Sequence, residues 1–309
     1  MIRAYYLAHK VSPPNKGIHM KKAFLFIITA GILWGTSGIF VHFLAPYGIT
    51  SLQMTSARAI VSLICVFLYA LFKKREAFSV KPAYLLLFLG IGASLFLTAS
   101  CYYSSMQMTS VSTAVVLMYA APIYVMVYSV AFLGEKLTKI KAVSVICMLI
   151  GCCLISGIVG GLKFDPLGVL IGVFSGISYA AYNVLTKIAM QKGISPTSTV
   201  LYGFSFMALI SLVGLDPKGL SESVSIESAV TIPLLIALGI CTFVIPYVLY
   251  TLAMKDLSAG SASALSIIEP MSATIFSVIL FDEKLSVFSV IGIVLILGAV
   301  YLMGKYEDK

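Results

Sequence analysis

The chain has 309 residues, of which 60% are hydrophobic and 11% are charged. Soluble globular domains are about half apolar and about a quarter charged, so this composition excludes an ordinary soluble protein. The formal net charge of +9 would suit a nucleic-acid partner only if the basic residues formed one patch. The basic residues are instead spread along the chain, mostly between its apolar stretches.

Residues 1–19 form an amino-terminal extension with a Pro-Pro pair and scattered charges. This segment has no apolar face to bury, and we expect it to be disordered. The apolar run from Ala23 to Leu44 is too long for the core of a secretory signal. We therefore expect the first membrane span there.

Ten apolar stretches are each long enough to cross the hydrocarbon of a bilayer, which takes about 20 helical residues. Backbone groups in lipid need internal partners, and stretches that are apolar on all sides favour helices over the alternating strands of a β-barrel. We thus expect an all-α integral membrane protein with ten transmembrane helices. The expected spans are residues 22–44, 49–72, 82–104, 110–133, 139–158, 167–189, 197–215, 231–254, 258–281 and 285–304.

The basic residues are distributed unequally between the two sides that ten spans define. Nearly all Lys and Arg fall on the side of the amino terminus, and the opposite side holds Lys163, Lys218 and Lys284. An excess of Lys and Arg marks cytoplasmic loops. We expect a multi-pass protein of the inner or plasma membrane with both termini in the cytoplasm, and no nucleic-acid partner.

The second half of the chain repeats the first. Residues 112–138 and 261–286 each contain a proline, Pro122 or Pro270, which is followed at the same distance by Glu-Lys-Leu. Repeated units of membrane helices are typical of transporters.

We assign repeat 1, with spans one to five, to residues 20–158, and repeat 2, with spans six to ten, to residues 159–309. A five-span unit starts on one side of the membrane and finishes on the other, so its copy lies upside down. Inverted repeats are related by a pseudo-two-fold axis in the membrane plane. Two bundles that exchange conformations would open a central pocket to one side and then to the other, which is alternating access.

These features resemble the drug/metabolite transporter superfamily, in particular its EamA family, over residues 22–304. The features that carry the resemblance are Trp34-Gly35, Arg58, the Tyr102 segment, Pro122 with Gly134-Glu135-Lys136-Leu137, Ser178-Tyr179-Ala180, Tyr250, and Glu269-Pro270 with Asp282-Glu283-Lys284-Leu285. Two residues depart from the family pattern: Tyr179 stands where the repeats often carry Trp, and Asp282 replaces a Gly. The resemblance implies a secondary transporter that exports small solutes such as amino acids, nucleotide-like metabolites or drugs.

Glu269 is the sharpest candidate for a functional residue. It lies near the middle of the expected ninth span, where an ionisable side chain costs about 2.5–3.5 kcal/mol on insertion scales and should face the bundle interior. Desolvation disfavours its charged form, so Glu269 could take up a proton, or it could be the counter-ion of a cationic substrate group. The alternative is a protonated or ion-paired Glu that holds helices together.

Arg58 lies near the middle of the expected second span. Because Arg keeps its charge, it needs an anionic partner, carbonyls or water at that depth. Three roles stay open: a bidentate clamp for a substrate carboxylate, an ion pair with Glu269, and a structural contact with carbonyls at a helix break.

Pro122 and Pro270 each remove a backbone donor and clash with the preceding turn. Helices broken at equivalent places in two halves point to a transporter binding site, although a packing kink is the alternative. Other residues that we expect at the same site are Trp34, Tyr102, Tyr119, Tyr179 and Asn183. Aromatic faces can hold cations, whereas aromatics at the interfaces and polar bonds between helices are the common alternatives.

We therefore expect a gradient-driven carrier that moves small polar organic solutes, amino acids or similar metabolites, outward, with protons as a candidate coupling ion. One alternative is a proton-coupled exporter of cationic drugs or amines. Alternatives of another class are a membrane scaffold without transport and an intramembrane enzyme. The sequence contains no nucleophile–base pair, phosphate loop or metal-ligand spacing, so we expect no catalytic residue, metal or cofactor. It does not indicate an oligomeric state.

Overall fold

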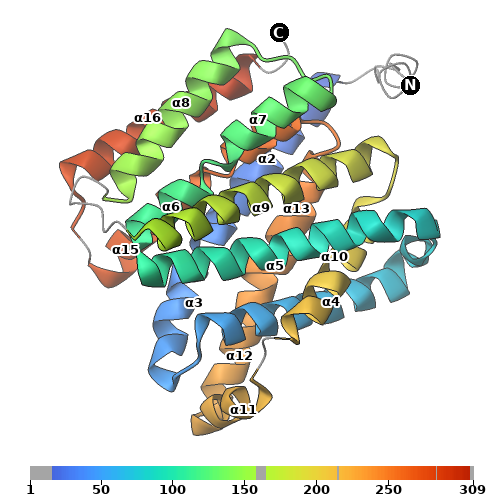
Figure 1. The fold of residues 1–309 in the computed structure, drawn as a ribbon, viewed down its shortest axis with the longest axis vertical. Coiled ribbons are helices and arrows are strands. Elements are labelled where there is room, and N and C mark those ends of the chain that lie inside the picture. Colours follow the sequence, from blue (N-terminus) through green and yellow to red (C-terminus); the bar gives the residue numbers. More distant parts are fainter. Residues whose placement is uncertain (1–15, 158–164, 214–215, 283, 307–309) are drawn as a thin grey trace.

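The computed structural model describes residues 16–157, 165–213, 216–282 and 284–306, and every regular element in these ranges is helical (Figure 1). Residues 1–15 of the expected disordered extension lie outside the described residues. The first helix begins at Lys16, so it starts before the expected first span. The elements of the first repeat are α2 (Lys16–Gly35), α3 (Ser37–Leu44), η1 (Ala45–Tyr47), α4 (Ser51–Lys73), η2 (Arg75–Phe78), η3 (Pro82–Tyr84), α5 (Leu85–Met108), α6 (Val111–Met118), α7 (Ala121–Phe132) and α8 (Lys139–Ile155).

The second repeat is built in the same way. Its elements are α9 (Pro166–Gln191), α10 (Pro196–Ser211), α11 (Pro217–Ile226), α12 (Ser228–Gly239), the π-helical turn η5 (Ile240–Val244), α13 (Ile245–Ala253), α14 (Ala259–Leu265), α15 (Ile268–Phe281) and α16 (Val287–Tyr306). The short helix α11 was not predicted. It begins with Asp216, whose carboxylate accepts from the Gly219 amide, and with proline at the first helical position, a strong helix start.

Eight helical stretches among the described residues are long and apolar enough to cross a membrane, at 20 to 29 residues each. The chain is therefore a multi-pass membrane protein. Two of the ten expected spans, 139–158 and 197–215, correspond to shorter helices, α8 with 17 residues and α10 with 16.

The helices that carry Pro122 and Pro270 are interrupted one turn before each proline. Helix α6 ends at Met118 and α7 begins at Ala121, and likewise α14 ends at Leu265 and α15 begins at Ile268. A proline ring clashes with the carbonyl four residues earlier, and these carbonyls belong to Met118 and Ser266. The two predicted helix breaks are thus present at equivalent positions of the two repeats.

The amino-terminal caps repeat as well. Ser110 accepts a bond from the Thr113 amide, and Ser258 accepts one from the Ser261 amide at the matching place of the second repeat. The end of the following helix also matches. Gly134 has φ 68°, and its counterpart Asp282 has φ 54°, the left-handed conformation that Asp tolerates better than most side chains. The duplicated sequence therefore forms duplicated local structure.

The peripheral helices α8 and α16 lie side by side in Figure 1. Their backbones are in close contact. A methyl group added at Gly151 would lie 2.8 Å from the Gly292 carbonyl oxygen, and one added at Gly292 would lie 2.6 Å from the Gly151 oxygen. Small residues permit this approach between membrane helices.

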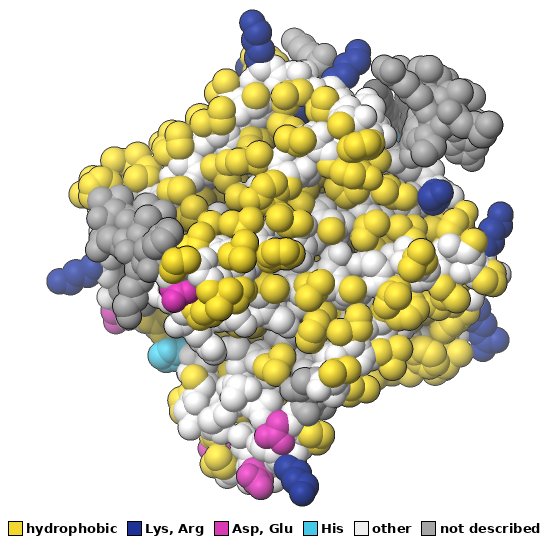
Figure 2. All heavy atoms as spheres, in the orientation of Figure 1, with side chains coloured by type: hydrophobic (Ala, Val, Ile, Leu, Met, Phe, Trp, Pro, Cys, Tyr) yellow, Lys and Arg dark blue, Asp and Glu magenta, His cyan; other side chains and the backbone are white. Residues whose placement is uncertain are grey.

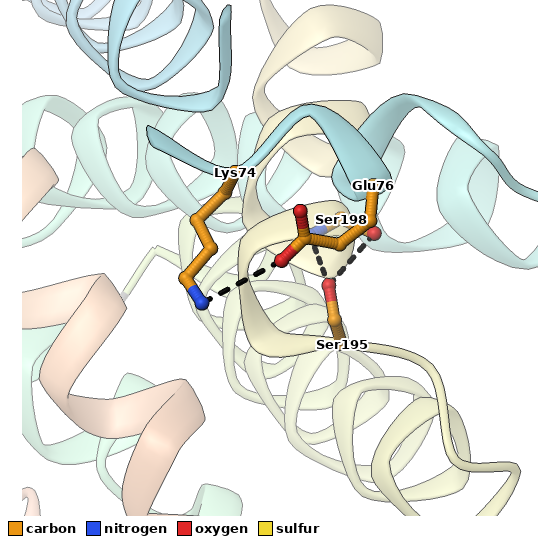
Figure 3. Close-up of polar contacts among 4 residues, drawn as sticks. All are labelled: Lys74, Glu76, Ser195 and Ser198. Atoms are coloured by element: carbon orange, nitrogen blue, oxygen red, sulfur yellow. Dashed lines mark hydrogen bonds and ion pairs between the residues drawn. The ribbon is translucent and has the colours of Figure 1, made fainter. Parts of the chain in front are cut away.

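The loop between α4 and α5 contacts the start of α10 and so joins the two repeats. The Ser198 hydroxyl donates to the Ala77 carbonyl at 3.0 Å. Figure 3 shows Ser195 capping α10 through Ser198, next to the exposed pair of Lys74 and Glu76, whose charged atoms are 3.5 Å apart. Exposed ion pairs of this kind contribute about 0–1 kcal/mol.

Apolar side chains cover most of the face seen in Figure 2, as expected for a surface that contacts lipid. Most of the visible Lys and Arg side chains lie along the upper and right edges, and the visible Asp and Glu lie at the left and lower edges. Charge therefore gathers at the margins of an apolar surface.

Candidate functional site

A cavity of about 600 Å³ lies between the helices of the two repeats. Its exposed rim contains Gly38, Val41, Val111, Lys284 and Leu285, and its inner wall contains buried aromatic residues. All of these rim residues lie toward the same side of the helix bundle, the side where α3 and α15 end and α6 begins. The cavity therefore opens at one end of the molecule, and the described residues at the opposite helix ends do not line it.

Arg58 of α4 lies on the cavity wall and is held by neighbours that use one of its three nitrogens. Nη2 donates to Thr55 Oγ1 at 3.1 Å and to the Tyr103 hydroxyl at 3.2 Å. The guanidinium carbon lies 5.0 Å from the centre of the Phe243 ring, a cation–π distance. Among the described residues no partner occupies Nη1, and Nε is buried without one. The guanidinium thus keeps donors for another molecule.

Glu269 lies in the first turn of α15, directly after the break in that helix, and lines the cavity together with Pro270. No ion pair joins Glu269 to Arg58, and both belong to the described residues. The pairing left open by the sequence is therefore absent from this conformation. The lining of the cavity thus carries both a cation and a carboxyl group.

Aromatic side chains from both repeats form the inner part of the cavity. Trp34, Tyr119 and Tyr179 line it with exposed fractions of 5%, 2% and 6%, and half-buried Tyr102 lies nearer the rim. The Trp34 ring is 5.1 Å from Tyr247 and meets it edge-on. Such aromatic pairs add about 0.5–1.5 kcal/mol beyond their burial.

Two predicted site residues do not line the cavity. Asn183 is fully buried one helical turn beyond Tyr179, where its amide donates to the Tyr179 carbonyl at 2.6 Å and its oxygen accepts from the Tyr250 hydroxyl. Pro122 is buried in the first turn of α7. Its break turns the α6–α7 connection toward α9, where a methyl group at Gly176 would lie 2.5 Å from the Leu117 carbonyl oxygen.

Tyr247 and Phe243 also line the cavity and were not predicted. Phe243, Tyr247 and Tyr250 are spaced by three to four residues, so they share one helical face. That spacing was the signal in the sequence. It does not tell which aromatics reach the cavity, because Tyr250 is fully buried and Tyr247 lines the wall.

Gly35 permits close contact between α2 and α15 at the cavity wall. A methyl group there would lie 2.7 Å from Ser272 Cβ and 2.9 Å from the Ala273 amide nitrogen. Because backbone cannot move aside cheaply, we expect Gly35→Ala to destabilise the protein by about 1–3 kcal/mol. Gly38→Ala is the matched control, since nothing lies within 4 Å of its added methyl group. Thermal unfolding in detergent should show a clear loss for the first variant alone, and equal stability of the two would contradict this packing.

Comparisons with known proteins agree with this architecture. The EamA-like transporter family matches residues 21–157 and again residues 166–305. An uncharacterized transporter of Archaeoglobus fulgidus is 30% identical over 277 residues, covering 89% of this chain and 94% of the relative. The uncharacterized transporter YwfM of Bacillus subtilis is 27% identical over 299 residues, covering 92% and 94%.

A more distant relative and a solved structure extend these similarities. The uncharacterized inner membrane transporter YicL of Salmonella typhimurium is 22% identical over 291 residues, covering 92% of this chain and 95% of the relative. A solved crystal structure aligns with a TM-score of 0.76 at 20% identity over 93% of this chain and 97% of that chain, which supports the fold alone. The duplicated helices, the cavity and the two family matches together place the chain in the EamA-like transporter family.

Proposed function

We propose that the protein is a secondary carrier that moves small polar organic solutes, amino acids or related metabolites, outward across the cell membrane. The observation that carries this proposal is the open cavity, whose lining combines Arg58, Glu269 and aromatic rings. Such a site offers a partner to a carboxylate, a partner to an ammonium group and apolar faces for the rest of the solute.

The donors that Arg58 leaves unused favour a solute with an anionic group. Nη1 has no described partner, and it shares one edge of the guanidinium with Nη2, an edge that matches the two oxygens of a carboxylate. A carboxylate on this edge would give Nη1 an acceptor that the described residues do not supply, and only while it occupied the cavity. Nη2 would exchange one of its two contacts, with Thr55 or Tyr103, for the charged acceptor.

The transport mechanism that we propose is alternating access between two inverted five-helix bundles, with α8 and α10 completing ten spans. Both helices are apolar, and a helix of 16 or 17 residues can still span where flanking residues reach the interface. Both termini would lie in the cytoplasm. In that orientation Lys284 and the cavity rim face outward.

The cavity also supports a second candidate function, the export of cationic amines coupled to protons. Glu269 among aromatic rings suits a cation. Arg58 on the same cavity opposes it, because like charges in one cavity repel. For this reason we favour a solute that carries both charges.

Counterflow in proteoliposomes tests the proposed function. Thermal-shift screening of the purified protein against amino acids, amines and nucleobases selects solutes, and vesicles preloaded with each are then given the labelled form outside. A carrier should accumulate label transiently, and vesicles without protein should not. If no solute of the three classes exchanges, the carrier is the wrong description.

A further inference from the structure

The cavity is closed at the end opposite its rim by three successive layers of polar contacts. The side chains of Tyr179, Asn183 and Lys187 follow one another at four-residue spacing on α9, so they lie along one helical face. Tyr179 lines the cavity, Asn183 bonds Tyr250 beneath it, and Lys187 lies one turn further. The α9 face therefore runs from the cavity into its closed end.

The bond between Asn183 and Tyr250 is the first layer. The second layer is formed by Lys187 and lies wholly within the second repeat. The Lys187 side chain is 8% exposed, and its ammonium group donates to the carbonyls of Met254 at 2.8 Å and Leu257 at 2.5 Å. These carbonyls belong to the end of α13 and the turn that follows it. A cation bound to carbonyls at a helix carboxyl end is well placed electrostatically, so α9 and this turn form one unit.

The third layer joins the two repeats. The Glu135 carboxylate accepts from the Ala259 amide at 2.7 Å and from the Gly260 amide at 3.3 Å, and the Lys141 ammonium group donates to Ser258 Oγ at 3.1 Å. Ala259 and Gly260 are buried. Glu135 and Lys141 lie in the first family match, and Ser258 to Gly260 lie in the second.

The turn before Glu135 sets its direction. Gly134 has φ 68°, and the Glu135 amide donates back to the Ser129 carbonyl at 3.1 Å. This is the arrangement in which a glycine in the left-handed conformation ends a helix. The carboxylate is thereby presented to the first amides of α14, where negative charge is favourable.

We propose that this contact of Glu135 and Lys141 with residues 258–260 is the gate at the closed end of the cavity. It rests on the proposed transport by alternating access. The gate holds while the cavity is open at the Lys284 end, and it separates when the carrier opens the other way. The contact that breaks is the one between the repeats, at Glu135, whereas the Lys187 contacts stay intact within the second repeat.

A cysteine reporter tests the gate without any solute. Ser263 is fully buried on α14, on the same face as Ala259 and one turn nearer the cavity, and its hydroxyl has no partner among the described residues. Ser263→Cys should react slowly with a hydrophilic maleimide. Mass spectrometry at this position separates its reaction from that of the six native cysteines.

Adding Glu135→Gln should raise the labelling rate about tenfold or more, because it replaces a charge-assisted contact with a weaker neutral one and the open population rises accordingly. Glu76→Gln is the matched control. Glu76 belongs to an exposed ion pair (Figure 3). Unchanged labelling with Glu135→Gln, or an equal rise with Glu76→Gln, would overturn the gate. Thermal unfolding of each variant shows whether it is folded.

A second measurement locks the gate instead of loosening it. In Glu135→Cys with Ala259→Cys, a short bifunctional methanethiosulfonate should abolish counterflow, and a reductant should restore it. Each single cysteine variant treated in the same way should keep its exchange. Continued exchange by the linked double variant would contradict the gate. A failure to find any transported solute would leave the labelling result intact, so the two proposals fail separately.

Discussion

Replacing Arg58 by glutamine should lower counterflow by about 100-fold or more. In our account Arg58 gives a solute carboxylate two charge-assisted hydrogen bonds, which are worth roughly 3–6 kcal/mol together. A factor of ten corresponds to about 1.4 kcal/mol. The guanidinium of Arg58 is already oriented by hydrogen bonds from Nη2 to Thr55 Oγ1 at 3.1 Å and to the Tyr103 hydroxyl at 3.2 Å. Little ordering of this side chain is therefore needed when the solute binds.

Arg58→Lys distinguishes a carboxylate clamp from a simple positive charge. Lysine keeps the charge but cannot reproduce the planar pair of donors, and we expect about a tenfold loss of exchange with this variant. Arg75→Gln is the matched control, because the Arg75 side chain is exposed and donates to the Leu71 carbonyl away from the cavity. Full exchange by the lysine variant would contradict the clamp. A loss of stability equal to the loss of exchange would favour a structural role.

Glu269→Gln should lower exchange of ammonium-bearing solutes by about tenfold to 100-fold, because a hydrogen bond to a charged group contributes roughly 1.5–3 kcal/mol. Glutamine keeps the shape of the side chain and removes its charge. If Glu269 also carries the coupling proton, wild-type exchange should change with pH, and exchange by the glutamine variant should not.

The control for this prediction is Glu222→Gln, an exposed carboxylate on α11 that does not line the cavity. It should leave both rate and pH dependence unchanged. Equal rates and equal pH profiles for wild type and Glu269→Gln would show that Glu269 neither binds nor couples. A solute without an ammonium group should be affected less by Glu269→Gln than by Arg58→Gln.

Features that depend on local chemistry were predictable from the sequence. Pro122 and Pro270 each remove a backbone donor and clash with the preceding turn, and the breaks before them are found as predicted. The duplication follows from equal spacing of Pro and Glu-Lys-Leu. It is supported in the structure by matching caps at Ser110 and Ser258 and by the left-handed turns at Gly134 and Asp282.

Features that depend on how helices rotate against one another were not predictable. Asn183 and Tyr179 lie one turn apart on α9, and only Tyr179 reaches the cavity. Tyr247 and Phe243 line the wall, because the π-helical turn and the following helix α13 direct them there. The expected span 197–215 also extends past the end of α10 at Ser211, and the polar helix α11 was not predicted, because hydropathy marks only apolar segments.

The most direct test of the account is protection of the cavity by a transported solute. Ser277 lines the cavity on α15, and Ser277→Cys introduces a thiol of nearly the same size. We expect a transported solute to slow labelling at position 277, with half-protection at the concentration that half-saturates counterflow, and we expect Arg58→Gln to remove the protection. Undiminished labelling at position 277 while the same solute is being exchanged would show that transport takes another path.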